Sequence, residues 1–282
     1  MSNFLLAVAA ILLAPTVGAL ISGVDRKLTA WFQGRVGPPV YQPFLDTIKL
    51  LSKEKNIVNS RQMICVLVYL LSSMAAVFLF FLGSDLLLIF FILTIGAVSF
   101  ITGAMSVPSP YSQVGAQREL MQVLTYEPLL LLTFVGFFLI TGSFNISHIL
   151  TWDEPLLFAM PLIYIALGFA LTIKLRKSPF DISASHHGHQ EIVKGSLTEY
   201  SGPQLAMVEI AHWYEIILIL GIFALFWSTS AAGMIIFLCI TYLAEILIDN
   251  LVARSTWRWM IAHVWPVGLG LIIINYILIL GM

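Results

Sequence analysis

Long apolar runs separated by shorter polar segments make up most of this chain of 282 residues. A helix needs about 20 apolar residues to cross roughly 30 Å of hydrocarbon, and eight runs are long enough. The run that ends at Ile140 reaches this length only if it extends upstream through Glu127. The pattern predicts an all-α polytopic membrane protein whose eight transmembrane helices lie at 4–22, 63–82, 86–105, about 120–140, 156–173, 204–227, 231–248 and 260–280.

Composition supports this class. The chain is 59% hydrophobic and 10% charged, whereas soluble domains average about 45–50% and about 25%. The net charge of −1 provides no basic field for nucleic acid, and both cysteines, Cys65 and Cys239, fall in apolar runs. A soluble protein, a nucleic-acid binder, a disulfide scaffold and a cysteine-ligated iron–sulfur cluster in this chain are therefore excluded.

The distribution of Lys and Arg predicts the orientation. All 14 fall in segments 23–62, 106–119, 174–203 and 249–259, which the eight spans place on one face. Because positive loops stay on the cytoplasmic side, both termini are expected outside, and the first run is expected to be retained since it lacks the basic start of a cleaved signal. We therefore expect a single membrane domain, 1–282, with two long inner loops, 23–62 and 174–203, that dock a peripheral arm.

The first inner loop is expected to contain an amphipathic helix that begins at Pro43. Leu45, Ile48 and Leu51 share one helical face with Phe44. Neighbouring basic residues favour a position flat at the membrane interface, with a soluble cap helix as the alternative.

Four carboxylic acids fall inside the predicted spans, whereas no Lys or Arg does. An ionised, unpaired carboxylate at mid-membrane costs about 2.5–3.5 kcal/mol, so these acids should be protonated, hydrated or partnered. Such groups can load and release protons. Glu209, His212 and Glu215 follow the spacing i, i+3, i+6 and so share one face of the helix expected at 204–227. No ionisable residue continues outward, so we expect protons to leave sideways into another membrane subunit. The predicted proton path contains Glu127, Glu209, His212, Glu215 and Glu245.

Two alternatives stay open for these acids. They could simply bond neighbouring helices, and the shallow Glu245 could snorkel to the interface. A b-type haem has weak support, because only His212 is expected to lie deep and His263 lies near the face.

The second inner loop gathers ionisable residues. We expect it to act as a docking surface or a proton relay, with a metal site or a solvated loop as alternatives. A metal is disfavoured because the loop has no His pair spaced i, i+4 and no identifiable distant ligand. The candidates are Asp181, His186, His187, His189, Glu191 and Glu199.

Three blocks of sequence carry a resemblance: GRVGPPVYQPFLDTIKLLSKE at 34–54, AQRELMQVLTYEPLL at 116–130 and PFDISASHHGHQEIVKGSLTEYSG at 179–202. With them, nearly the whole chain resembles the subunit-1 family of respiratory NADH dehydrogenase. It is most similar to the relatives that anchor Ech-type energy-converting NiFe hydrogenases and formate hydrogenlyases.

The resemblance implies roles for individual residues. Glu127 is similar to the family's acid in the fourth span, and Arg35 to the arginine of its GRVGP turn. Asp181 corresponds to the PFD aspartate, Glu191 to the last acid of the loop cluster and Glu199 to the acid of the EYSG motif.

The resemblance also implies partners and a location. The chain would be a stator in the prokaryotic plasma membrane, with no cofactor and no catalytic residue of its own. The 4Fe-4S clusters and the NiFe centre would lie in partner subunits. The implied partners are an iron–sulfur subunit of the hydrogenase small type, a NiFe large-type subunit, an antiporter-like membrane subunit and, indirectly, ferredoxin.

Two departures from quinone-reducing relatives favour the hydrogenase branch: the longer SASHHGHQE after PFD, and His212 where those relatives carry an acid. The sequence thus predicts a membrane-anchor and proton-entry subunit of an energy-converting hydrogenase, coupling ferredoxin oxidation and H₂ formation to H⁺ or Na⁺ translocation. One alternative is the quinone-site subunit of a NADH or ferredoxin:quinone oxidoreductase. Another is a stand-alone secondary transporter, disfavoured because the two halves show no matching broken helices.

Overall fold

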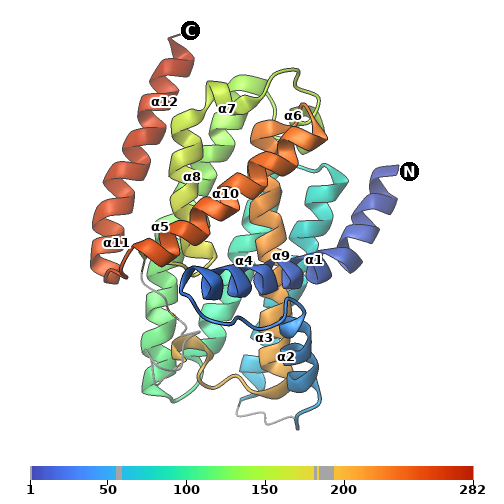
Figure 1. Cartoon of the computed structure of the whole chain (residues 1–282), viewed down its shortest axis with the longest axis vertical. Helices are drawn as coiled ribbons and strands as arrows, with labels where there is room; N and C mark the ends of the chain where they lie inside the picture. The colour runs from blue at the N-terminus through green and yellow to red at the C-terminus, as the bar shows by residue number, and fades with distance from the viewer. Residues whose placement is uncertain (1, 55–58, 181–182, 184–193, 282) are drawn as a thin grey trace.

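The computed structural model describes residues 2–54, 59–180, 183 and 194–281, and within them the regular structure is helical apart from an isolated bridge between Asp85 and Asn145 (Figure 1). Seven stretches of this described part are long and apolar enough to cross a membrane. They are α1 (Ser2–Phe32), α3 (Ser60–Leu82), α4 (Leu86–Met105), α5 (Pro110–Thr141), α9 (Gly202–Ala224) with η2 (Leu225–Trp227), α10 (Ala231–Leu251), and α11 (Trp257–Val264) continued by the π-helical η3 (Trp265–Leu269) and α12 (Gly270–Leu280).

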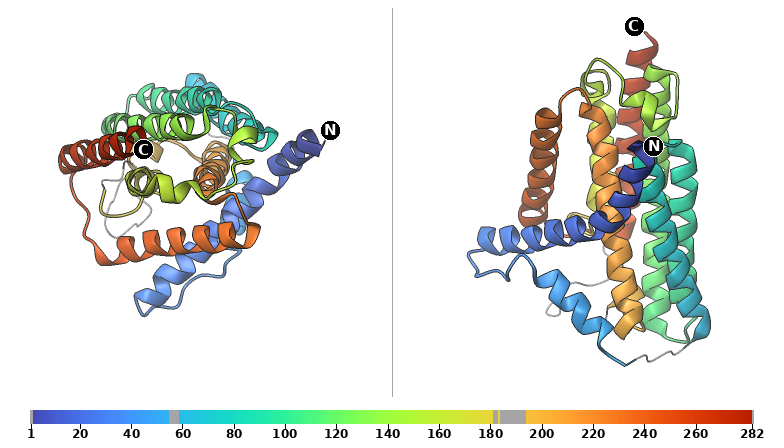
Figure 2. Two further views of the ribbon diagram at one scale, coloured as in Figure 1. Left: turned by 90° about the horizontal axis from the view of Figure 1, so that it is seen from above. Right: turned by 90° about the vertical axis from the view of Figure 1, so that its right-hand side faces the viewer.

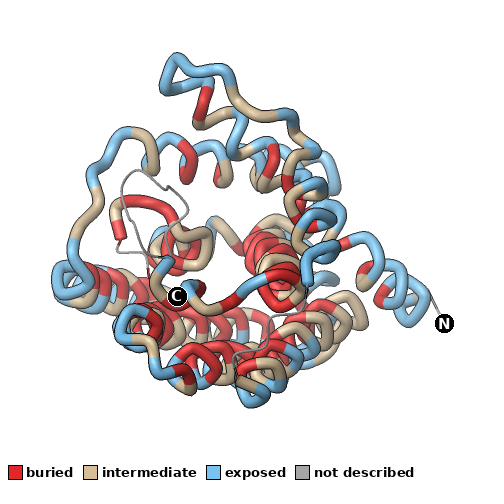
Figure 3. The backbone as a smooth tube through the Cα atoms, turned by 90° about the horizontal axis from the view of Figure 1, so that it is seen from below, coloured by how far each residue is buried: buried red, intermediate tan, exposed pale blue. Residues whose placement is uncertain are grey.

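The shorter helices are α2 (Gln42–Leu51), α6 (Ile146–Ile149), α7 (Leu156–Ala159), α8 (Pro161–Lys174) and η1 (Gly195–Leu197). Helices α3, α4, α5, α8 and α9 form an upright bundle, while α1 and α10 run obliquely across one side of it (Figures 1 and 2). Helix α9 is the most enclosed long helix, with 56% of its apolar window buried against 22% for α1, α10 and the α11–α12 stretch. It is therefore the most enclosed of the candidate spans, and the buried positions gather on the inward sides of the helices (Figure 3).

Helix α1 is longer than the expected span 4–22, because it continues to Phe32 and carries Asp25, Arg26 and Lys27 within a helix. It contains Pro15, whose ring cannot join the helical hydrogen-bond pattern, and it bends along its length (Figure 2). A Cβ atom at Gly18 would lie 2.6 Å from the Trp213 carbonyl oxygen, so only glycine permits this approach of α1 to α9.

The amphipathic helix expected in the first inner loop is present as α2. Phe44 packs on Trp213 of α9 with ring centroids 5.9 Å apart, whereas Leu45, Ile48 and Leu51 are exposed. Of the apolar side chains of α2, Phe44 thus packs against the bundle, whereas these three leucine and isoleucine side chains form a row that no other part of the described chain covers. An uncovered apolar row is what a helix at the membrane interface presents, and that location stays a prediction.

The expected span 156–173 is not one continuous helix. Helix α7 ends before Met160, and α8 begins at Pro161 and is only 14 residues long. Proline has no N–H to continue a helix, and Asn275 of α12 compensates for the break: its Oδ1 accepts from Leu162 N at 2.9 Å and its Nδ2 donates to the Ala159 carbonyl at 2.9 Å. The prediction of eight crossings and of both termini outside remains a prediction.

The outer surface of the long helices is apolar. Large exposed side chains include Leu12 of α1, Ile240 of α10 and Ile277 of α12. Such continuous apolar surface belongs against lipid or other membrane subunits.

Candidate functional site

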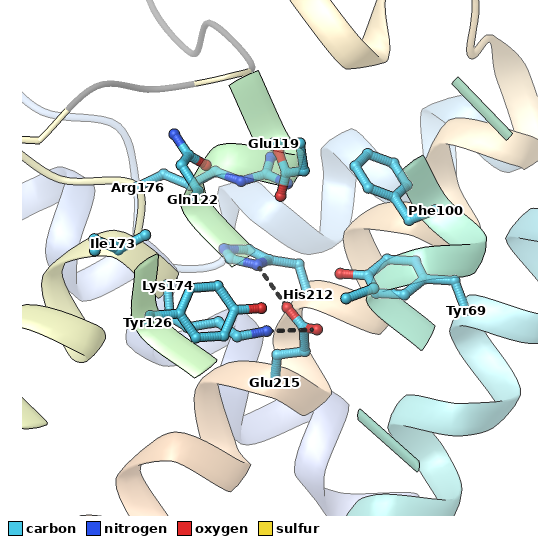
Figure 4. Close-up of a pocket in the computed structure, with 11 residues that line it drawn as sticks. Tyr69, Phe100, Glu119, Gln122, Tyr126, Ile173, Lys174, Arg176, His212 and Glu215 are labelled. Carbon is cyan, nitrogen blue, oxygen red and sulfur yellow. Dashed lines mark hydrogen bonds and ion pairs between the residues drawn. The ribbon is translucent and has the colours of Figure 1, made fainter. Parts of the chain in front are cut away.

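A small polar cavity lies inside the bundle, where α3, α5, α8 and α9 meet (Figure 4). It has about 20 Å³ of room for the centres of water molecules, which is enough for a water molecule with several polar partners. Its polar lining consists of Tyr69, Glu119, Gln122, Tyr126, Lys174, Arg176, His212 and Glu215.

An ion pair forms the floor of this cavity. Lys174 Nζ, at the end of α8, lies 3.0 Å from Oε1 of Glu215 on α9, and the two side chains are only 11% and 9% exposed. Although no Lys or Arg falls inside a predicted span, Glu215 therefore has a cation of the same chain beside it. Lys174 follows the apolar run by one position and so resembles a loop residue in the sequence, yet the short α8 ends inside the bundle.

Two more side chains, His212 and Tyr126, lie beside this ion pair. His212 lies one turn before Glu215 on α9, with Nδ1 3.9 Å from the second carboxylate oxygen, and Lys174 Nζ lies 4.8 Å from the centre of the Tyr126 ring. Figure 4 shows His212 and Lys174 approaching Glu215 from different sides. Glu215 can therefore share charge with either an ammonium or an imidazole.

A further cation, Arg176, also lines the cavity; it lies two residues after the end of α8 and has a left-handed φ of 56°. Burial alone would lower the pKa of Arg176, but nearby carboxylates, chiefly Glu119, raise it above its ordinary value. Glu119 of α5 also accepts a hydrogen bond from the Ser183 hydroxyl. The second inner loop is thus attached to the polar cavity at the Glu119 carboxylate.

The structure separates the residues of the predicted path. His212 and Glu215 line the inner cavity, whereas Glu209, on the same helix, lines a different one. Glu127 is half-buried on α5 beside Thr94 of α4 and within the field of Lys174. The predicted ladder on α9 is thus divided between two cavities.

Glu245 belongs to a separate cluster between α1, α8 and α10. It is 5% exposed and accepts a hydrogen bond of 2.9 Å from the Thr172 hydroxyl. Snorkelling to the interface is therefore wrong for Glu245. In the same region Lys177 Nζ lies 2.7 Å from Asp25 Oδ1 of α1 and 5.1 Å from the centre of the Tyr242 ring.

The second cavity, about 270 Å³, lies between α1, α2 and α9. Two carboxylates, Asp46 and Glu209, face it together with four cations, which are Arg26, Lys49, Lys53 and Lys194. It is larger and more charged than the inner cavity, and most of its lining residues belong to the first inner loop.

Of the seven residues predicted for the inner loops, Arg35 and Glu199 lie in the part of the chain that the structure describes. Arg35 is exposed after the turn at Gly34, which has a φ of +66°, and its guanidinium donates to the Gln33 side chain. Gln33 in turn donates to Asn250 of α10 at 2.9 Å. Glu199 is half-buried between η1 and α9. The other five, Asp181, His186, His187, His189 and Glu191, lie outside the described residues.

Sequence reasoning missed the cations and acids at the edges of the apolar runs, namely Asp25, Glu119, Lys174, Arg176 and Lys177. A usable signal existed, because Lys174 and Lys177 follow a run that is short for a complete span. Within the described part of the chain, no three His, Cys, Asp or Glu side chains gather as a metal site.

Comparison with known proteins agrees with this architecture. The family model described as NADH dehydrogenase matches residues 5–280. The chain is 31% identical to Hydrogenase-4 component C of Escherichia coli (strain K12), over 95% of this chain and 92% of that protein. It is 29% identical to a NADH-quinone oxidoreductase subunit of Bacillus cytotoxicus, over 75% of this chain and 71% of the other.

A solved structure shares the fold. A chain of the membrane-bound sulfane sulfur reductase, an archaeal respiratory membrane complex, superposes with a TM-score of 0.86 at 25% identity, covering 99% of this chain and 100% of that one. Together with the seven apolar helices, these relatives identify a multi-pass protein of the prokaryotic plasma membrane. The chain belongs to the NADH dehydrogenase family.

Proposed function

We propose that this chain is the membrane-anchor and proton-entry subunit of an energy-converting hydrogenase complex, which couples ferredoxin oxidation and H₂ formation to H⁺ or Na⁺ translocation. The similarity to Hydrogenase-4 component C along almost the whole of both chains supports the hydrogenase branch. The observation that carries the proton-entry role is the buried group of Lys174, Glu215 and His212 around a cavity of water size.

The chemistry of this group suits proton entry. A proton that reaches Glu215 neutralises the carboxylate and weakens its attraction to Lys174, because an ion pair needs both charges. His212 can then accept or pass on the proton, because its Nδ1 faces the second carboxylate oxygen and an imidazole can accept a proton on one ring nitrogen and donate one from the other. Water in the cavity can connect these groups to Glu119, and from there to the second inner loop.

Neighbouring subunits supply the remaining functions in this proposal. The inner loops dock an iron–sulfur subunit with 4Fe-4S clusters and a NiFe large-type subunit, and the uncovered apolar faces contact lipid and an antiporter-like membrane subunit. The chain crosses the membrane eight times with both termini outside, and α7 and α8 together form the crossing that is interrupted at Met160.

The test uses inverted membrane vesicles that contain the complete complex. Reduced ferredoxin should drive H₂ formation together with acidification of the vesicle interior, which a pH-sensitive dye reports. Collapse of acidification by a protonophore indicates H⁺ as the primary ion, whereas sodium-dependent H₂ formation that a sodium ionophore uncouples indicates Na⁺. H₂ formation with no ion gradient of either kind would refute the proposal.

A second candidate function is the quinone-site subunit of an oxidoreductase. The cavity between α1, α2 and α9 favours it, because this is a space large enough for a headgroup beside the membrane. Purified complex that reduces a short-chain quinone but forms no H₂ from reduced ferredoxin would select this function over the hydrogenase.

A further inference from the structure

The cavity between α1, α2 and α9 has an excess of positive charge. Four cations and two carboxylates face it, which leaves two positive charges after pairing. Arg26 is held by Asp46, with Nη1 3.0 Å from Oδ2. In the part of the chain that the structure describes, no carboxylate lies within ion-pair distance of Lys49, Lys53 or Lys194. None of the three ammonium groups therefore has a carboxylate partner among the described residues, and with Asp46 and Glu209 counted the cavity keeps a net charge of +2 that an anion can neutralise.

Exposed aliphatic side chains lie on the two helices, α1 and α2, that flank the cavity. Helix α2, which supplies Lys49, also exposes Leu45 and Ile48, and α1 exposes Leu20 and Val24 just before Arg26. An anion bound here would thus carry its charged part among ammonium groups and any hydrocarbon part along exposed aliphatic side chains. This combination of charge and hydrocarbon is the chemistry of a phospholipid.

We infer that this cavity binds the phosphate headgroup of an anionic phospholipid at the cytoplasmic surface of the membrane. Lys49, Lys53 and Lys194 contact the phosphate, and the acyl chains lie along α1 and α2. The bound lipid fills the space between α2 and the bundle and fixes α2 against α9, where Phe44 already packs on Trp213. An uncharged quinone headgroup would leave the two excess positive charges of the cavity uncompensated, so the charges favour the lipid. The inference does not depend on the reaction of the peripheral arm.

The experiment uses the intact purified complex, washed in detergent and reconstituted into nanodiscs of phosphatidylglycerol and phosphatidylcholine in equal parts. After a second extraction, mass spectrometry gives the ratio of the two lipids that each complex retains. The variant Lys49→Gln/Lys53→Gln/Lys194→Gln should retain less phosphatidylglycerol, with about a fivefold loss of affinity for each lysine. Lys27→Gln is the matched control, because Lys27 is an exposed lysine of α1 that does not line the cavity.

A single Lys49→Gln variant and a salt titration of the unmodified complex guard against misassembly of the triple variant. Retention should fall in both, because salt screens the attraction. Unchanged retention in the triple variant would overturn the inference. So would equal displacement by inorganic phosphate, which indicates a site for free anions, or displacement by a short-chain quinone. Loss of the peripheral subunits with full retention of phosphatidylglycerol would instead assign the lysines to protein docking.

Discussion

Lys174 and Glu215 join the last residue of α8 to the middle of α9 through an ion pair of 3.0 Å inside the bundle. Such a pair gains little over an apolar contact of the same shape, because both charges lose their hydration, but it is costly to break from one side. The charge of Glu215 and the position of the end of α8 are therefore linked. A proton that arrives at the carboxylate releases the constraint on α8.

The substitution Glu215→Gln is expected to destabilise the complex, because it leaves the Lys174 ammonium buried without a counter-charge. The loss of free energy of unfolding should be about 3–5 kcal/mol. Thermal unfolding of the purified complex measures it. The double variant Lys174→Met/Glu215→Gln should recover most of the lost stability, since no buried charge is then left unpaired.

The same double variant tests the proton role. It should assemble and transfer electrons, yet acidify inverted vesicles much less than the unmodified complex. If the double variant pumps normally, the ion pair is only structural. If Glu215→Gln alone is as stable as the unmodified complex, Lys174 is not paired with Glu215 in the membrane.

The sequence predicts well the helices whose limits are set locally. The expected span 86–105 coincides with α4 because Asp85 caps the helix, accepting from Leu87 N at 2.7 Å, and the apolar run that follows is unbroken. The amphipathic pattern after Pro43 predicts α2 for the same reason.

Features that depend on distant contacts are not predictable in this way. The break at Met160 is stabilised by Asn275, more than a hundred positions further along the chain. The sequence identifies Glu215 as a membrane acid but assigns its partner Lys174 to a loop, because the end of α8 depends on packing in the bundle rather than on hydrophobicity. The place of Glu245 in its apolar run indicates a shallow position, whereas α1 and α8 cover it.

Glu127 has a different environment and should respond differently to substitution. It is half-buried on α5 and has no ion pair within the described residues. Glu127→Gln keeps the shape and hydrogen bonding of the side chain but cannot ionise. The complex should therefore assemble with normal thermal stability and show reduced acidification of inverted vesicles. Glu154→Gln, an exposed acid between α6 and α7, is the control, and equal pumping by both variants would remove Glu127 from the path.

Asn275 should be essential for the interrupted helix. Asn275→Leu fits the apolar surroundings but leaves Leu162 N and the Ala159 carbonyl without their partners. Each buried group left unpaired costs about 1–3 kcal/mol. Thermal unfolding should therefore shift to lower temperature, whereas Ile274→Ala, at a neighbouring position that is 51% exposed, should have little effect. Equal stability of Asn275→Leu and the unmodified complex would show that the break at Met160 does not need Asn275.

Arg35 is expected to contribute to attachment of the peripheral arm. It is exposed after the Gly34 turn, and its hydrogen bond to Gln33 connects it to Asn250 of α10, so the guanidinium is held in place on a surface formed by two helices. A positioned guanidinium binds carboxylates with two parallel hydrogen bonds, which favours contact with an acidic partner. Arg35→Ala should therefore lower the amount of peripheral subunits that remain bound on detergent extraction, measured by quantitative gel analysis. Arg61→Ala is the matched control, because Arg61 is also exposed but lies in the first turn of α3. Full retention of the arm in Arg35→Ala, or the same loss in both variants, would show that Arg35 has no specific docking role.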